Sequence, residues 1–309
     1  MAVPDRAPAE ALAGPEPVER ERGIAALDPV PPPLLVLGAA TSVQFGGAVA
    51  ATLFDDVGPA GTALLRLAFA AIVLGALWRP RVRGHPRGSL RLILAFGLAL
   101  GVMNLCFYEA LERIPLGVAV TIEFAGPMGV AVALSRRRLD LVWVALAAAG
   151  ILLLADPFGA GGVDPVGLAF VLAAAAAWAA YILLAQRTGA LFRGSTGLAM
   201  ASVVAVFVPL VPGIADAGTD LLGAEPLLVG ALVALMSSVI PYTLEVEALR
   251  RLPANVFGVL MCLDPAVAAL AGFVVLGQRL GARELMAIAL VVVASIGVTR
   301  TTPATPVDG

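Results

Sequence analysis

The sequence has very few of the residues on which most enzymes depend. It contains one histidine, His85, which lies in an arginine-rich stretch, two cysteines and no lysine. The sequence patterns HExxH, GxSxG and Walker A are absent, and no Cys/His cluster is available to bind a metal. These absences argue against catalysis, and we expect neither a cofactor nor a metal site.

Charged residues are also scarce. They make up 14% of the 309 residues, whereas apolar residues make up 60%. Soluble domains are roughly half apolar, so a soluble core has no use for this much apolar surface. The net charge of −2 gives no reason to expect nucleic acid as a partner. We therefore expect an integral membrane protein with the lipid bilayer as its solvent.

Small residues occur inside the apolar stretches. Cys106 and Cys262 both lie in such stretches, where we expect them to be buried as small hydrophobic side chains and not to form a disulfide. Gly97 and Gly101 form a GxxxG pattern, which is typical of close contact between two membrane helices.

The two ends of the chain have a different composition from its centre. Residues 1–33 are rich in proline and carry scattered Glu, Asp and Arg, and they lack an apolar run followed by a cleavage site. We interpret residues 1–33 and 301–309 as disordered cytoplasmic tails.

Ten stretches are long and apolar enough to cross a bilayer as helices, given that about 17 to 25 residues are needed. The fifth, seventh and tenth are the shortest. The predicted fold is therefore an all-α integral membrane protein with ten transmembrane helices, at residues 34–54, 59–78, 90–111, 115–135, 139–155, 165–186, 195–212, 226–249, 254–276 and 282–299.

The arginines support this count, because short cytoplasmic loops accumulate basic residues. With the N-terminus inside the cell, sixteen of the twenty arginines fall on the cytoplasmic side. Arg113, Arg279 and Arg283 fall outside, and Arg66 lies within a span. We predict that both termini and the loop at residues 84–87 are cytoplasmic and that residues 216–220 face outward, in the inner membrane of a bacterium.

Two segments of the chain repeat each other. Residues 109–127 read EALERIPLGVAVTIEFAGP and residues 247–265 read EALRRLPANVFGVLMCLDP, with seven of nineteen positions identical. Each predicted half has an odd number of spans, so the second copy enters the membrane in the opposite sense. The sequence thus predicts two inverted five-helix repeats, at residues 34–155 and 165–300, an arrangement typical of transporters.

Several segments resemble the EamA family of drug/metabolite transporters. The resemblance is carried by the paired segments, by LLRLAFA at residues 64–70 and by AAWAAYILLAQR at residues 176–187. Within the family, RRRLDLVWV, PYTLEVEALRRLP and FGVLMCLDPAVAALAGFVVLGQRL are similar to the threonine/homoserine exporter branch. The resemblance implies secondary active export from a central cavity lined by both repeats, with coupling to protons. It leaves open export of another metabolite or of lipophilic cationic drugs.

Charged residues inside the membrane are costly and mark candidate sites. Glu109 and Glu247 each precede an arginine, Arg113 and Arg251, by four residues, so we expect two structural ion pairs near the membrane surfaces.

Glu123 and Asp264 have no such neighbour, and each lies beside a proline, Pro127 or Pro265. Proline lacks an N–H group, so the carbonyl four residues before it loses its helical donor. We interpret both acids as candidates for substrate binding and for carrying the coupling proton.

Arg66 has two readings. It either neutralises Glu123 or Asp264, or its planar guanidinium binds a substrate carboxylate. A zwitterionic amino acid would use the arginine for its carboxylate and one acid for its ammonium group, which leaves the other acid for a proton. This charge inventory favours a small neutral amino acid as the substrate.

The remaining candidates are polar or aromatic. Glu245 near the inner end of the eighth span lies either at the mouth of the pathway or in an ion pair with a nearby arginine. Further candidates to line a cavity are Asn104, Tyr108, Trp178, Tyr181 and Tyr242. A channel or a scaffolding protein is a more remote alternative, and the sequence does not indicate an oligomeric state.

Overall fold

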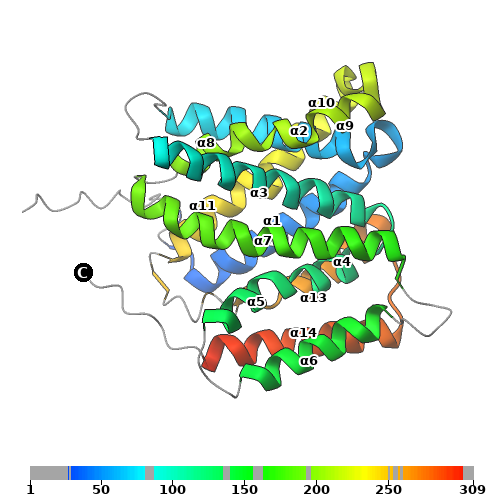
Figure 1. Cartoon of the computed structure of the whole chain (residues 1–309). Helices are drawn as coiled ribbons and strands as arrows, with labels where there is room; N and C mark the ends of the chain where they lie inside the picture. The colour runs from blue at the N-terminus through cyan, green and yellow to red at the C-terminus, as the bar shows by residue number, and fades with distance from the viewer. Residues whose placement is uncertain are drawn as a thin grey trace, which may run out of the picture.

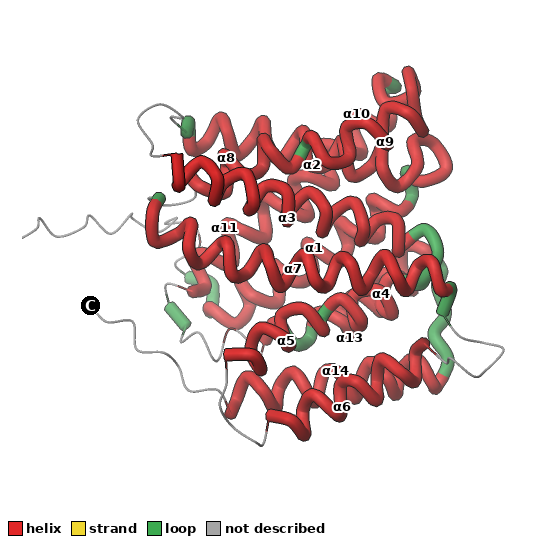
Figure 2. Tube along the Cα trace, in the orientation of Figure 1, coloured by secondary structure: helices red, strands yellow, loops and turns green. Residues whose placement is uncertain are grey.

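The computed structural model describes residues 27, 29–80, 87–134, 140–155, 163–192, 196–249, 251–252, 257 and 260–301. Within these residues the chain is helical, with short turns and no strand, as Figure 2 shows. The predicted all-α class is therefore confirmed.

The helices follow the apolar stretches closely. They are α1 (Pro32–Ala51), α2 (Phe54–Trp78), α3 (Arg87–Leu111), α4 (Leu116–Glu123), α5 (Ala125–Leu134), α6 (Asp140–Ala155), α7 (Pro165–Leu191), α8 (Thr196–Ala205), α9 (Phe207–Ala217), α10 (Ala224–Ala234), α11 (Ile240–Leu249), α13 (Asp264–Leu276) and α14 (Ala282–Thr301).

Several of the predicted spans contain irregular turns. The fourth is divided at Phe124 into α4 and α5, and the eighth contains a π-helical turn, Leu235–Val239, between α10 and α11. The helix α2 begins five residues before the predicted span and is kinked at Gly58, whose φ of 67° suits glycine, just before Pro59. In the π-helical turn, the carbonyls of Met236 and Ser237 accept hydrogen bonds from side chains of α1 and α2.

The predicted count of ten spans is not confirmed by helix length and composition. Among the described residues six helices are long and apolar enough to cross a membrane: Pro32–Ala51, Phe54–Trp78, Gly88–Leu111, Pro165–Thr188, Thr196–Leu222 and Ala224–Glu245. Shorter apolar helices are Leu116–Val130, Leu141–Leu153 and Asp264–Leu276. The turn at Phe124 and the start of α13 at Asp264 shorten two of the predicted spans.

The helices pack as a bundle in which elements far apart in sequence lie side by side (Figure 1). The most extensive contacts join α3 to α7, α6 to α14 and α2 to α9. The helix α1 contacts both α11 and α13, and α4 contacts α13. Helices from the two halves of the chain are therefore interleaved and do not form separate bodies.

Two glycines of α3, Gly97 and Gly101, allow a close contact with α8. A Cβ atom at Gly97 would lie 2.6 Å from the carbonyl oxygen of Ala201, and one at Gly101 would lie 2.7 Å from that of Ala205. The GxxxG pattern thus brings α3 against α8, which confirms the predicted close helix contact.

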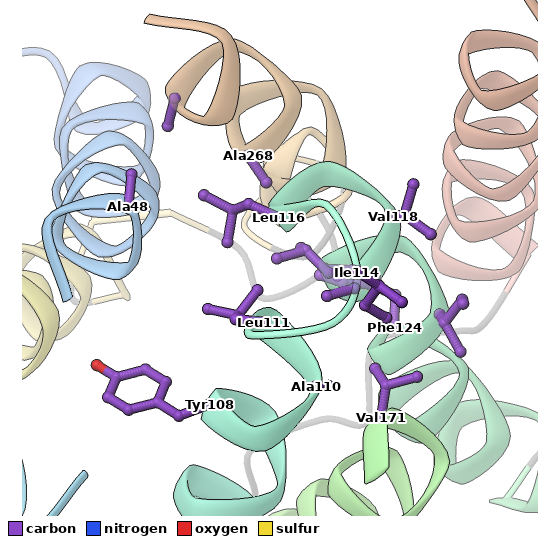
Figure 3. Packing of buried hydrophobic residues seen from close by; sticks show 14 of the residues in the cluster. Ala48, Tyr108, Ala110, Leu111, Ile114, Leu116, Val118, Phe124, Val171 and Ala268 are labelled. Atoms are coloured by element: carbon purple, nitrogen blue, oxygen red, sulfur yellow. The ribbon is translucent and has the colours of Figure 1, made fainter. Parts of the chain in front are cut away.

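The largest hydrophobic cluster surrounds the junction of α3 and α4. Figure 3 shows Leu111, Ile114 and Leu116 packed beside Ala268 of α13 and Val171 of α7. The N–H of Leu116 donates to Gln278 Oε1 at 3.0 Å, which ties the start of α4 to the chain just after α13. This packing fixes the two short helices that carry Glu123 and Asp264.

Some predictions fall outside the described residues, namely most of both tails, His85 and nearly all of its loop, and the arginines at 136–138. Within the predicted N-terminal tail, Leu27 and Val30 are described, and they pack against a cluster that includes Val36 and Ala248. Cys106 carries a free thiol, so the two cysteines do not form a disulfide, as predicted.

Candidate functional site

A cavity of about 210 Å³ lies at the centre of the bundle. Helices from both halves of the chain contribute to its wall, through α1, α2, α3, α4, α7, α11 and α13. The structure brings together in this wall eight of the nine residues that the sequence marks as candidates: Arg66, Asn104, Glu123, Trp178, Tyr181, Tyr242, Glu245 and Asp264.

Arg66 of α2 is held by two groups, neither of which is an acid. Its Nη1 donates to the hydroxyl of Tyr108 at 3.1 Å, and its Nη2 donates to the carbonyl of Ser237 at 3.1 Å. Its Nε–H is buried without a hydrogen-bond partner among the described residues. The guanidinium is thus fixed at two of its three nitrogens, and the third, Nε, has no hydrogen-bond partner among the described residues.

Glu123 and Asp264 are the two buried acids of the cavity. They are 8% and 4% exposed, and Oδ1 of Asp264 has no hydrogen-bond partner among the described residues. The charges of Arg66 and Asp264 both act on Glu123. Nevertheless, within the described part of the chain no ion pair joins Arg66 to either acid. Arg66 therefore lies in the same cavity wall as both acids without a direct ion pair to either, and its two readings stay predictions.

Glu245 of α11 faces the same cavity. It forms no ion pair with an arginine in the described residues, and its charge acts on Asp264. Glu245 thus lies in the cavity wall, and its place on a transport pathway stays a prediction.

Aromatic rings form one side of the cavity. The ring of Trp178 meets that of Phe124 edge to face, with centroids 5.4 Å apart, and Tyr181 packs on Phe96 with centroids 5.1 Å apart. Such pairs keep large side chains in defined positions. Trp178 and Tyr181 of α7 thus bring two aromatic side chains, each packed on another ring, to the cavity wall.

Two amides add polar groups to this wall. Asn104 donates through Nδ2 to the carbonyl of Leu100 at 2.8 Å, so its Oδ1 remains available as an acceptor. Gln44 of α1, which is 5% exposed, also lines the cavity. Sequence reasoning missed Gln44, although a lone amide inside an apolar helix is itself a signal of a polar interior.

Tyr108 does not line the cavity, contrary to prediction. It is fully buried behind Arg66, because its ring packs against Phe54 with centroids 5.8 Å apart and lies 5.5 Å from the guanidinium carbon of Arg66. Other lining residues that the sequence did not reveal are Ala40, Val43, Gly47, Met103, Phe107, Val120, Phe124, Ser237, Pro241 and Met261.

Comparison with known proteins decides the family. The chain is 42% identical to the threonine/homoserine exporter RhtA of Salmonella typhimurium strain LT2 over 275 residues, which cover 87% of this chain and 92% of that protein. It is 41% identical to RhtA of Escherichia coli K12 over the same shares. The sequence profile of the EamA-like transporter family matches residues 165–300. The chain belongs to the EamA-like transporter family.

A solved crystal structure gives independent support for the fold of this EamA protein. It has a TM-score of 0.56 and 18% identity, and the match covers 87% of this chain and 97% of the other. At this identity the likeness concerns the fold alone.

Family membership settles two of the predictions. The EamA protein is a transporter and not an enzyme, as predicted. Together with its apolar helices, membership makes it a multi-pass protein of the inner membrane.

Proposed function

We propose that this EamA protein exports small neutral amino acids, with threonine and homoserine as the first candidates, in exchange for protons. One observation carries the proposal: a single arginine and two buried acids that are not paired with it share one central cavity. The relatives that cover most of the chain are named threonine/homoserine exporters, which supports the same substrate class.

The charges of the cavity match those of a zwitterion. The Nε–H of Arg66 is an unsatisfied donor for a carboxylate, and an unsatisfied buried donor costs about 1–3 kcal/mol until a partner arrives. One of Glu123 and Asp264 binds the ammonium group, and the other takes up the proton. Asn104, Gln44, Trp178, Tyr181 and Tyr242 surround the rest of the substrate, and Glu245 lines the same cavity as a third carboxylate, which we assign to the pathway.

The size of the cavity favours this substrate over a lipophilic drug. Pockets for drug-sized ligands measure roughly 300–1,000 Å³, whereas this cavity measures about 210 Å³. A lipophilic cation has no carboxylate, so it would leave the guanidinium of Arg66 without an anionic partner. Export of another small metabolite remains the second candidate.

We also propose ten spans in two inverted repeats, at residues 34–155 and 165–300, with both termini cytoplasmic. The contacts are those that a twofold axis in the membrane plane would generate. Contact of α1 with α11 and α13 has its counterpart in contact of α7 with α3 and α4, while α6 with α14 and α2 with α9 pair equivalent helices.

Transport assays test the function. Export of a panel of labelled amino acids would be measured from cells that produce the protein, together with their tolerance of toxic external threonine or homoserine. We expect threonine and homoserine to be exported, Arg66→Ala to abolish export and Arg66→Lys to retain part of it. Unchanged tolerance together with resistance to lipophilic cations would transfer the assignment to drug export.

The coupling acid is identified by changing each carboxylate alone. Glu123→Gln or Asp264→Asn should abolish export driven by a pH gradient, and the variant that lacks only the coupling acid should retain exchange of labelled for unlabelled threonine. Proton antiport is wrong if both variants transport at the parent rate across the pH range. Dissipation of an ion gradient without substrate would indicate a channel.

Single cysteines test the topology in a background in which Cys106 and Cys262 are replaced. A cysteine at Thr219 should react with an impermeant reagent in intact cells, whereas one at Gly84 should react only after permeabilisation. The reverse pattern would overturn the orientation.

A further inference from the structure

The π-helical turn Leu235–Val239 is tied to two other helices through its backbone. The hydroxyl of Ser42 on α1 donates to the carbonyl of Met236 at 2.7 Å, and Nη2 of Arg66 on α2 donates to the carbonyl of Ser237 at 3.1 Å. Gly46 of α1 packs directly on the turn, since a Cβ atom there would lie 2.9 Å from Cβ of Met236. Both carbonyls lie within the π-helical turn, and π-helical turns occur frequently at functional sites.

Arg66 is therefore clamped on two sides. The carbonyl of Ser237 accepts from one terminal nitrogen and the hydroxyl of Tyr108 accepts from the other, while the Tyr108 ring lies 5.5 Å from the guanidinium carbon. A guanidinium is planar, so two fixed corners determine the direction of its remaining donors. Among these remaining donors is the Nε–H, which is buried and has no hydrogen-bond partner among the described residues.

We propose that Tyr108 and the π-helical turn are positioning elements, which hold the guanidinium of Arg66 so that its Nε edge receives the carboxylate of the substrate. Tyr108 acts through Arg66 and does not touch the substrate, and Ser42 acts one step further back, through the turn. The inference rests on the proposed function, because it requires Arg66 to bind a carboxylate.

A positioning role for the Tyr108 hydroxyl can be distinguished from a purely packing role for the Tyr108 ring. Tyr108→Phe keeps the ring and its contact with Phe54 and removes only the hydroxyl that orients Arg66. Without this hydroxyl the guanidinium of Arg66 is less well oriented and binds a carboxylate more weakly. The affinity for a ligand that lacks a carboxylate should not change. The matched pair of ligands is threonine and threoninol, the amino alcohol in which the carboxylate is replaced by a hydroxymethyl group.

The experiment measures equilibrium binding of both ligands to the purified full-length protein and the KM and Vmax of threonine export. We expect Tyr108→Phe to weaken threonine binding about tenfold, equivalent to one lost hydrogen bond, and to raise KM with little change in Vmax. Binding of threoninol should not change. Ser42→Ala should show the same pattern at about threefold, and it provides a second variant if Tyr108→Phe does not fold.

Ser202→Ala is the control, because its hydroxyl donates to Leu198 within α8 and does not contact Arg66. Equal weakening of threonine and threoninol in Tyr108→Phe would assign Tyr108 a purely structural role and overturn the inference. Loss of threonine binding in Arg66→Ala combined with parent-like binding in both Tyr108→Phe and Ser42→Ala would overturn the inference alone. Unchanged threonine binding in Arg66→Ala would overturn the proposed substrate site and this inference with it.

Discussion

The two copies of the motif Glu-Ala-Leu-x-Arg-x-Pro, at residues 109–115 and 247–253, share one contact and differ in the next. In both, the arginine pairs with the glutamate four residues earlier, at 3.0 Å for Arg113 with Glu109 and 3.3 Å for Arg251 with Glu247. Beyond this pair, Arg113 also binds Glu112 at 2.8 Å and lies over the ring of Phe170 on α7.

Arg251 uses its remaining donors differently. Its Nη1 and Nη2 donate to the carbonyls of Val30 and Leu27, each at 3.2 Å. Each arginine therefore contacts the start of the first helix in the other half of the chain. Arg113 lies near the start of α7, and Arg251 binds residues just before α1. The comparison teaches that two copies of a repeat can keep the contact between the same two structural elements while the interacting groups differ.

The largest difference between the copies should come from removing each arginine. Arg251→Gln removes the ion pair with Glu247, which is 5% exposed, and two bonds to carbonyls. We expect a loss of about 2–4 kcal/mol in the free energy of unfolding, at the lower part of the range for breaking a buried pair because Arg251 is partly exposed. Arg113→Gln should cost no more than about 1 kcal/mol, since its acids are better solvated. Thermal unfolding of the two purified variants in the same detergent measures this, and equal losses would break the comparison.

A somewhat smaller effect should follow from deleting residues 1–30, which removes the carbonyls of Leu27 and Val30. Two hydrogen bonds to a charged group, offset by water at the membrane surface, lead us to expect a loss of about 1–2 kcal/mol. The same deletion in Arg251→Gln should have less effect than in the parent, because the two changes remove the same bonds. Full additivity in this double-mutant cycle would show that Arg251 does not bind the segment.

Replacing each arginine by lysine sharpens the comparison. Lysine keeps the positive charge but lacks the planar guanidinium with its several N–H donors. Arg251→Lys therefore cannot bind two carbonyls and a carboxylate together, and we expect it to lower the free energy of unfolding by about 1 kcal/mol. Arg113→Lys should lower the free energy of unfolding by only a few tenths of a kcal/mol, because its partners are the nearby carboxylates of Glu109 and Glu112, which a lysine can also reach. The shift in unfolding temperature between the two variants is the readout, and a larger shift for Arg113→Lys would contradict the assignment.

The smallest effect concerns Phe170, which only the first copy uses. Phe170→Leu keeps an apolar side chain but loses the ring beneath the Arg113 guanidinium, whose carbon lies 5.3 Å from the ring centroid. We expect a loss of about 0.5–1 kcal/mol that disappears when Arg113 is already replaced by Gln. A loss that persists in the double variant would be due to packing on α7.

The sequence predicted those contacts that depend only on the spacing of residues along a helix. The i,i+4 ion pairs and a close helix contact at Gly97 and Gly101 could be predicted, because both follow from spacing along one helix, whereas the partner helix α8 could not. The candidate residues of the cavity could be found because charged and aromatic groups are conspicuous in an apolar span.

Features that depend on the packing of distant segments could not be predicted. The π-helical turn has no local signature in its residues, and its carbonyls become significant only when α1 and α2 lie against them. For the same reason Tyr108 was predicted to line the cavity, whereas it packs behind Arg66. The kink at Gly58 was also missed, because the charged pair Asp55 and Asp56 resembled a loop although helix α2 begins at Phe54.

The clamp on Arg66 also has a consequence for biosynthesis. Tyr108 lies 42 residues after Arg66, whereas Ser237 lies 171 residues after it, in the second half of the chain. While the ribosome is still making α7, Arg66 is already in the membrane and lacks the carbonyl that will hold it. A chain that stops after the first half never acquires that carbonyl. Because an arginine that lacks one of its partners is costly in lipid, the first half alone should be recognised by membrane proteases, and completion of the second half should stabilise the first.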